Sequence, residues 1–163
     1  MFKNGKMIVT CLDLEGVLIP EIWKGLAELT KIEDLKLTTR DIEDYDELMK
    51  LRLKICDTNN LTLQDIHTVV EKINPFDGAI DFLKWLRRRT EVVILSDTFR
   101  EFLTPLVKKL QYPTILCNSL KVDKNFKIIE YRLRQKDPKK KAVKVFKSLN
   151  YYTIAVGDSY NDI

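Results

Sequence analysis

The chain has 163 residues, of which 45% are hydrophobic and 32% charged, and its formal net charge is +4. This balance excludes collagen, a disulfide scaffold and an extended disordered chain, and the length predicts one domain, or a domain with an insert, with room for a sizeable core. The basic clusters at 87–89 and 139–141 are only three residues long, which favours solvated helix faces over nucleic-acid binding, and the lack of any apolar run of about 18 residues predicts no membrane span.

Residues 7–12 form a short, β-rich apolar run, which is typical of a buried parallel strand. Helical patterns without a strand between them follow at residues 21–29, 41–56 and 63–73. Thr62 is the predicted N-cap of the third of these helices, with Asp65 three residues further on. We therefore predict that residues 17–76 form a helical cap inserted after the first strand.

The rest of the chain alternates helices with strands. Its predicted elements are a helix at 78–89, a strand at 92–95, an amphipathic helix at 99–110, a strand at 114–117, a β-hairpin at 119–134, a helix at 139–149 after Pro138, and a strand at 153–156. This alternation predicts an α/β fold with a Rossmann-like parallel sheet, built from residues 1–16 and 77–163. A helix normally follows such a last strand, so we expect the chain to be truncated at its C-terminus.

Polar clusters follow three of the predicted strands. They are Asp13-Leu14-Glu15-Gly16, Ser96-Asp97-Thr98, and the segment from Gly157-Asp158 to Asp162. In an open α/β sheet the ligand crevice lies outside the carboxyl ends of the strands. Any one cluster is typical of an ordinary loop, but the three together, in this order, predict a single site.

The sequence lacks the motifs of several kinds of catalytic site. The only histidine, His67, lies in the helical insert, and neither an HExxH pattern nor a Gly-rich phosphate-binding loop with lysine is present. Cys11 lies inside an apolar strand, which disfavours a cysteine nucleophile. Cys11, Cys56 and Cys117 form no CxxC pair, so we expect core thiols in a reducing, cytoplasmic setting.

Carboxylate chemistry remains. Asp13 and Glu15, two residues apart at a strand end, are suited to divide the roles of nucleophile and general acid–base. Asp158 can join Asp13 in holding a hard cation such as Mg²⁺, which prefers one or two carboxylates and substrate phosphate. The Ser96 hydroxyl and the Asp97 amide are suitable donors to a phosphoryl group, and a lysine would balance its charge.

At this point the motifs resemble those of a known family. The shared stretches are L-D-L-E-G-V-L-I-P-E-I-W, T-T-R-D-I, V-V-I-L-S-D-T-F, L-R-Q-K-D-P-K and G-D-S-Y-N-D. They resemble the haloacid dehalogenase-like phosphatases, more closely the phosphoserine phosphatases, and in particular the bifunctional phosphoserine phosphatase/homoserine phosphotransferase branch. The resemblance extends from Met7 to Ile163.

The resemblance implies a role for each matching residue. Asp13 becomes an aspartyl phosphate, and Glu15 is the general acid–base in the position where most of the superfamily has aspartate. Mg²⁺ is held by Asp13, Asp158 and the backbone carbonyl of Glu15. Ser96 and the amide of Asp97 bind the phosphoryl oxygens.

The resemblance also implies how the substrate is held. Glu21 and Arg52, both in the helical insert, grip the ammonium and the carboxylate of an amino acid, and an arginine fork suits a carboxylate. The alternative for Arg52 is a surface salt bridge on its own helix. Asn161 is expected near the substrate, and Asp162 orients the lysine or a metal-bound water.

The motif lysine has two candidates. Lys139 and Lys136 both lie near the expected position. Lys139 is preferred because it comes directly after Pro138 at the start of the helix, where the phosphatase pattern has its lysine.

The predicted function is therefore Mg²⁺-dependent hydrolysis of phosphoserine in serine or threonine biosynthesis, with water or homoserine as the acceptor of the phosphoryl group. One alternative is a related phosphatase that acts on another small phosphomonoester, such as a sugar phosphate or a nucleotide. The other alternative is an inactive binding module. No nucleic-acid or membrane partner is expected, and a homodimer remains open.

Overall fold

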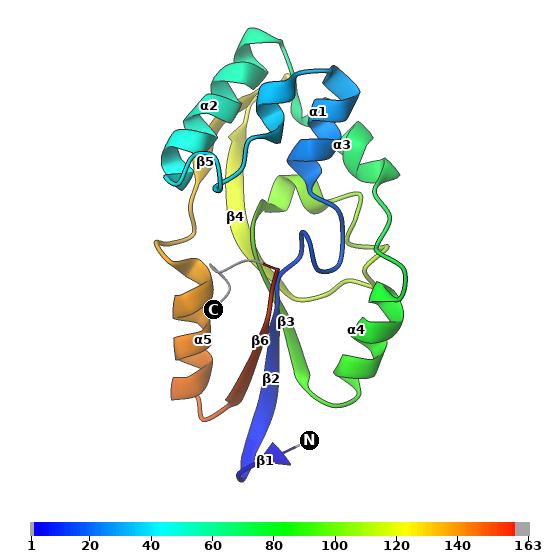
Figure 1. Cartoon of the computed structure of the whole chain (residues 1–163), viewed down its shortest axis with the longest axis vertical. Helices are drawn as coiled ribbons and strands as arrows, with labels where there is room; N and C mark the ends of the chain where they lie inside the picture. Colours follow the sequence, from blue (N-terminus) through cyan, green and yellow to red (C-terminus); the bar gives the residue numbers. More distant parts are fainter. Residues whose placement is uncertain (1, 159–163) are drawn as a thin grey trace.

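The computed structural model describes residues 2–158, and a mixed β-sheet lies at its centre (Figure 1). The parallel part of the sheet has the order β6-β2-β3-β4, and β1 and β5 pair antiparallel with β2 and β4. The strands are β1 (Phe2–Lys3), β2 (Lys6–Leu12), β3 (Glu91–Phe99), β4 (Ile115–Val122), β5 (Ile128–Arg132) and β6 (Tyr152–Val156). The predicted parallel sheet is confirmed.

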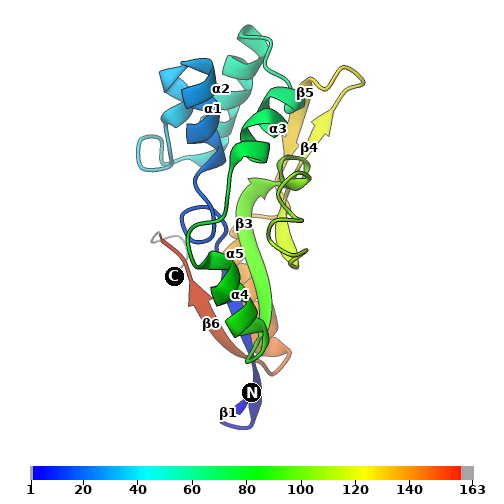
Figure 2. The same ribbon diagram turned by 90° about the vertical axis from the view of Figure 1, so that its right-hand side faces the viewer.

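The central strand β2 is buried from Ile8 to Leu12 because helices cover both faces of the sheet. Helices α4 (Ala79–Arg87) and α5 (Pro138–Ser148) lie on opposite faces (Figures 1 and 2). Leu12 belongs to the larger core cluster, together with α4, whereas Val9 and Cys11 pack with Ala142 of α5. Alternate residues of one strand therefore build two separate layers of core.

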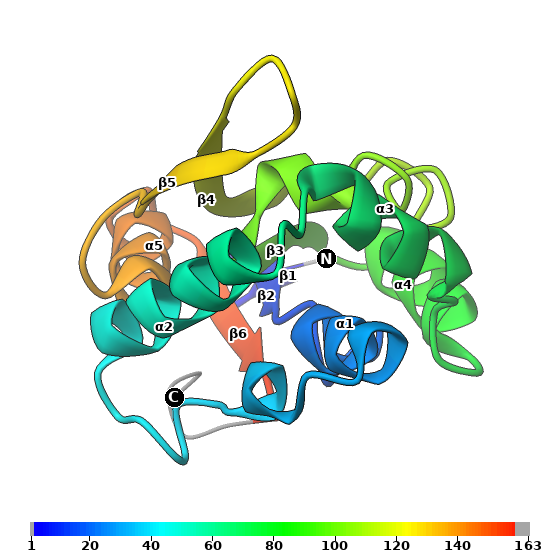
Figure 3. The ribbon, with the colours of Figure 1, turned by 90° about the horizontal axis from the view of Figure 1, so that it is seen from above.

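The remaining helices stand beyond the carboxyl ends of the strands. Viewed from above, they are arranged around the ends of β2, β3 and β6 (Figure 3). They are α1 (Ile22–Thr30), the 3₁₀ helix η1 (Glu33–Lys36), α2 (Tyr45–Thr58) and α3 (Leu63–Lys72). Helix α3 begins with the expected cap, in which the Asp65 carboxylate accepts from the backbone and the hydroxyl of Thr62. The division of the chain into core and cap stays a prediction.

The predicted helix at 99–110 is wrong. Only a short 3₁₀ helix, η2 (Arg100–Leu103), forms there, and turns follow it. Pro105 has no N–H to donate to the Glu101 carbonyl, so the α-helical ladder cannot propagate through this segment. The segment nevertheless buries five apolar residues, which explains their helix-like spacing: Phe99, Phe102, Leu103, Leu106 and Leu110.

Two strands are longer than predicted. β3 continues to Phe99, so Ser96-Asp97-Thr98 lies within the strand and not after it. The register of β3 with β4 shifts at these three residues, between Leu95 and Phe99. The predicted strand at 114–117 and the first arm of the hairpin are one continuous strand, β4.

None of the helices within residues 2–158 has the length and apolar character that crossing a bilayer requires.

Candidate active site

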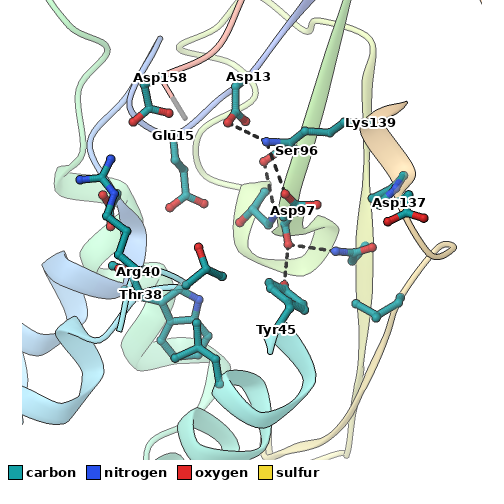
Figure 4. Close-up of a pocket in the computed structure, with 18 of the residues that line it drawn as sticks. Asp13, Glu15, Thr38, Arg40, Tyr45, Ser96, Asp97, Asp137, Lys139 and Asp158 are labelled. Carbon is teal, nitrogen blue, oxygen red and sulfur yellow. Dashed lines mark hydrogen bonds and ion pairs between the residues drawn. The ribbon is translucent and has the colours of Figure 1, made fainter. Parts of the chain in front are cut away.

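A cavity of about 560 Å³ lies between the strand ends and the helices above them (Figure 4). Most of the residues that the sequence assigned to the site line this cavity. They are Asp13, Glu15, Glu21, Arg52, Ser96, Asp97, Lys139 and Asp158, and the alternative lysine Lys136 lines it too. The remaining two predictions, Asn161 and Asp162, lie outside the described residues.

Asp13 is the first residue after β2. Its backbone N–H donates to the carbonyl of Val156 at 2.9 Å, which ties the end of β2 to the end of β6. One oxygen of its buried carboxylate, Oδ1, accepts from the Leu14 N–H at 2.7 Å, and the other, Oδ2, lies 2.7 Å from Lys139 Nζ. The carboxylate is therefore held in one orientation facing the cavity.

Lys139 reaches the cavity from the start of α5, where Pro138 occupies the first helical position. Its ammonium group also lies 3.3 Å from Asp97 Oδ2, and the side chain is only 13% exposed. A cation so placed between two carboxylates is positioned to bind an anionic group that arrives at Asp13.

Glu15 follows Asp13 two residues later, and its Oε2 accepts from the N–H of Ile22 at the start of α1 at 2.9 Å. Burial raises the pKa of Glu15 to about 7, the Ile22 N–H opposes this rise, and the charge of Asp13 adds a smaller rise. A carboxyl that titrates near neutral pH is suited to both giving and taking a proton.

Asp158 lies against the loop that carries Asp13 and Glu15. Gly16 has a left-handed backbone with φ of +81°, and a Cβ placed on it would come within 2.4 Å of Asp158 Oδ2. Glycine is therefore required twice at this position, by its backbone angle and by the approach of the carboxylate. Figure 4 shows Asp158 and Glu15 on one side of the cavity and Ser96, Asp97 and Lys139 on the other.

The donor set fits a hard divalent cation. Asp13 and Asp158 offer carboxylate oxygens beside the backbone of residues 13–16, which adds carbonyl oxygens. Within residues 2–158 there is no group of three or more His, Cys, Asp or Glu side chains that could hold a metal. Mg²⁺ needs few protein carboxylates, since it retains waters and binds substrate phosphate.

Ser96 and Asp97 are held by contacts that sequence reasoning missed. The Asp97 carbonyl accepts from Tyr45 Oη and from Asn118 Nδ2, both at 2.9 Å. Ser96 Oγ accepts from the Thr98 N–H at 3.2 Å. The only sequence signal for Tyr45 is its helical spacing with Leu48, Met49 and Ile55 in the predicted helix at 41–56.

Arg52 is buried and not on the surface. Its guanidinium lies 4.7 Å from the centre of the Trp23 ring, and Nη2 donates to the Leu37 carbonyl at 2.8 Å. Among the described residues, Nε has no hydrogen-bond partner. Burial lowers the pKa of Arg52, although an arginine remains charged at neutral pH.

Glu21 lies at the start of α1 and lines the same cavity. Its carboxylate pairs with Lys24 at 2.8 Å, and its side chain is 35% exposed. One acid and one buried guanidinium therefore face the space in front of Asp13.

Comparisons with known proteins agree with this geometry. A family model described as haloacid dehalogenase-like hydrolase matches residues 22–163. The chain is 56% identical over 156 residues to a protein named phosphoserine phosphatase ThrH from Pseudomonas aeruginosa, covering 96% of this chain and 76% of that protein. It is also 56% identical over 154 residues to a phosphoserine phosphatase from Pseudomonas syringae pv. tomato, covering 94% of this chain and 65% of the relative. The chain thus spans only part of both relatives.

Solved structures support the fold. An apo phosphoserine phosphatase superposes with a TM-score of 0.74 at 20% identity, and a phospho-aspartyl intermediate analogue of a phosphoserine phosphatase superposes with 0.71 at 19%. Each comparison covers 96% of this chain and 80% of the other. At these identities the likeness concerns the fold, and it confirms the predicted α/β class.

Proposed function

Because this chain belongs to the haloacid dehalogenase-like hydrolase family, we propose that it is a Mg²⁺-dependent phosphoserine phosphatase that works through a phosphoryl group carried on Asp13. The contact of Lys139 Nζ with Asp13 at 2.7 Å and with Asp97 at 3.3 Å is the observation that carries the proposal. It supports Lys139, and not Lys136, as the motif lysine. The names of the two curated relatives support phosphoserine as the substrate.

In the first step, an oxygen of Asp13 attacks phosphorus and the bond from phosphorus to the serine oxygen breaks. Glu15 gives its proton to the departing serine oxygen. Lys139, the Ser96 hydroxyl and the Asp97 amide stabilise the charge on the phosphoryl oxygens. These groups come from three separate parts of the chain, the loop of Asp13 and Glu15, strand β3 and the start of α5, and all of them line one cavity.

Mg²⁺ would be held by the carboxylates of Asp13 and Asp158 and by the backbone carbonyl of Glu15. When bound, it neutralises charge on the phosphoryl group and allows that group to approach the Asp13 carboxylate. Gly16 supports this assignment because it leaves room for Asp158 beside the Asp13 loop.

Arg52 and Glu21 select the amino acid. The guanidinium of Arg52 binds the substrate carboxylate, and the carboxylate of Glu21 binds the ammonium group after leaving Lys24. The helices α1 and α2, which carry these two residues, belong to the cap that we propose for residues 17–76. The cap separates the reaction from bulk water.

In the second step, an acceptor gives its proton to Glu15, its oxygen attacks phosphorus, and the bond to Asp13 breaks. Water as acceptor completes hydrolysis. Homoserine carries the same carboxylate and ammonium as serine, so the pocket of Arg52 and Glu21 suits it as a second acceptor. We therefore propose that the protein has both activities, and that it works in the cytoplasm, in amino-acid biosynthesis.

Phosphate release by the full-length protein tests the proposal. We expect turnover of phosphoserine that needs Mg²⁺, and much slower turnover of a sugar phosphate and of a nucleotide. Phosphohomoserine should form when homoserine is added. Faster turnover of a sugar phosphate or nucleotide would favour the alternative phosphatase, and no turnover of any phosphomonoester would favour a binding module.

A further inference from the structure

The peptide bond that joins Asp97 to Thr98 is held on both sides. Its carbonyl oxygen accepts from Tyr45 Oη and Asn118 Nδ2, each at 2.9 Å, which uses both lone pairs of that oxygen. Its N–H donates to Ser96 Oγ at 3.2 Å. This one peptide therefore connects a helix above the sheet to the hydroxyl in the cavity.

The donors to this peptide are well placed to keep it fixed. Asn118 is buried, and its Oδ1 accepts from the Arg134 N–H at 3.0 Å, so its amide nitrogen is directed to Asp97. Burial raises the pKa of Tyr45, so its hydroxyl keeps the hydrogen that it donates. Figure 4 shows Tyr45 approaching the Asp97 carbonyl from the side opposite Lys139.

The contacts form a continuous chain of hydrogen bonds. A peptide is a conjugated unit, so donation to its carbonyl polarises its N–H, and successive bonds in such chains strengthen one another. Because Ser96 Oγ accepts from Thr98, its own hydrogen is left to point elsewhere, toward the cavity that Ser96 lines. The chain thus runs from Tyr45 through the peptide to the Ser96 hydroxyl.

We propose that Tyr45 is a positioning residue for phosphoryl transfer, whose hydroxyl fixes the Asp97–Thr98 peptide and, through it, the direction and donor strength of the Ser96 hydroxyl. The inference rests on the proposed function in one respect, that Ser96 donates to the phosphoryl group. Tyr45 is the first residue of α2, and Arg52 lies about two turns later on the same helix. One helix therefore both binds the substrate carboxylate and completes the phosphoryl site.

If Tyr45 only stabilised the fold, removing another tyrosine hydrogen bond to α2 would lower kcat equally. Tyr131 of β5 also donates its hydroxyl to α2, at Asp46, whereas the side-chain hydrogen bonds of the Asp97–Thr98 peptide within residues 2–158 are made with Tyr45, Asn118 and Ser96. The substitution Tyr131→Phe therefore removes a tyrosine hydrogen bond from the same helix without touching the chain to Ser96. It is the matched control for Tyr45→Phe.

The experiment measures kcat and KM for phosphoserine and for a small phosphomonoester without charged amino-acid groups, with Mg²⁺. We expect Tyr45→Phe to lower kcat about 10-fold for both substrates with little change in KM, the loss that one net hydrogen bond accounts for. Tyr131→Phe should change kcat less than about twofold. In a Ser96→Ala background, Tyr45→Phe should have no further effect, because the group through which it acts is gone.

For a parent protein with turnover, three outcomes would overturn the inference. They are an unchanged kcat in Tyr45→Phe, an equal loss in Tyr131→Phe, and a full additional loss in the Ser96→Ala background. Failure of the proposed function gives a different result, because the parent protein would then hydrolyse the small phosphomonoester but not phosphoserine. The small phosphomonoester would still serve to test Tyr45. For a parent without turnover, calorimetry with inorganic phosphate and Mg²⁺ replaces kcat, and unchanged phosphate binding in Tyr45→Phe rejects the inference.

Discussion

Lys139 Nζ lies 2.7 Å from Oδ2 of Asp13, although the two residues are 126 positions apart in the chain. Both side chains are nearly buried, with 13% and 10% of their surface exposed, so this ion pair is screened little by solvent. Breaking such a pair leaves a charge without its partner in a poorly solvated place. Substitution of either residue therefore removes a close opposite charge from the other.

Lys139→Ala should lower kcat for phosphoserine by about 10²–10³-fold, because it removes a cation that stabilises the transferring phosphoryl group. Lys136→Ala is the matched control, since this lysine lines the same cavity from the loop before α5. We expect it to retain most activity. A larger loss in Lys136→Ala than in Lys139→Ala would move the motif lysine three residues back.

Gly16→Ala should weaken the response to Mg²⁺, because the new Cβ would meet the Asp158 carboxylate. Gly78→Ala is a matched control, since Gly78 has a φ of +80° and nothing lies within 4 Å of its added Cβ. In both variants the left-handed backbone lowers the free energy of unfolding by about 1 kcal/mol, because alanine has a Cβ. Only Gly16→Ala should raise the Mg²⁺ concentration needed for half-maximal activity, and an equal rise in both variants would separate Asp158 from the metal.

Arg52→Ala should raise the KM for phosphoserine strongly, since the loss of one partner of a buried charged pair costs about 2–5 kcal/mol in binding. Hydrolysis of a small phosphomonoester without a carboxylate should stay close to that of the parent. A parallel loss on both substrates would mean that Arg52 supports the fold of the cavity instead of reading the carboxylate. Melting temperatures separate these two effects.

The native thiols should react slowly with an alkylating reagent at pH 8. Burial raises the pKa of Cys11 and of Cys56 to about 11, and the thiolate is the reactive form, so little of either is reactive at this pH. Labelling followed by mass spectrometry measures the rate at each cysteine, and the denatured protein is the control. Rapid native labelling of Cys11 would contradict its burial in β2.

The location of the candidate site could be predicted from the sequence because it depends on short, local signals. Three apolar runs of the sequence each give way to a polar cluster, and parallel strands bring their carboxyl ends to one edge of the sheet, even though β3 continues through its cluster to Phe99. Pro138 likewise predicts the start of α5, and so the place of Lys139 in the first turn of that helix. These signals need no knowledge of tertiary contacts.

The rest depended on packing that no local pattern encodes. The bond from Tyr45 to Asp97 joins residues 52 positions apart, and it forms because the fold brings the first residue of α2 to β3. The segment after Phe99 has helix-like spacing, but Pro105 and burial against the core produce turns there. The burial of Arg52 against Trp23 likewise follows from how α1 and α2 meet.

Trapping the phosphorylated protein tests the central claim most directly. Phosphoserine and Mg²⁺ are mixed with the protein, the reaction is stopped with acid, and peptides are analysed by mass spectrometry. The proposed mechanism predicts a phosphoryl group on Asp13, and its absence in folded Asp13→Asn together with loss of turnover by several orders of magnitude. Near-normal phosphate release by Asp13→Asn, or a phosphoryl group found on another residue, would contradict it.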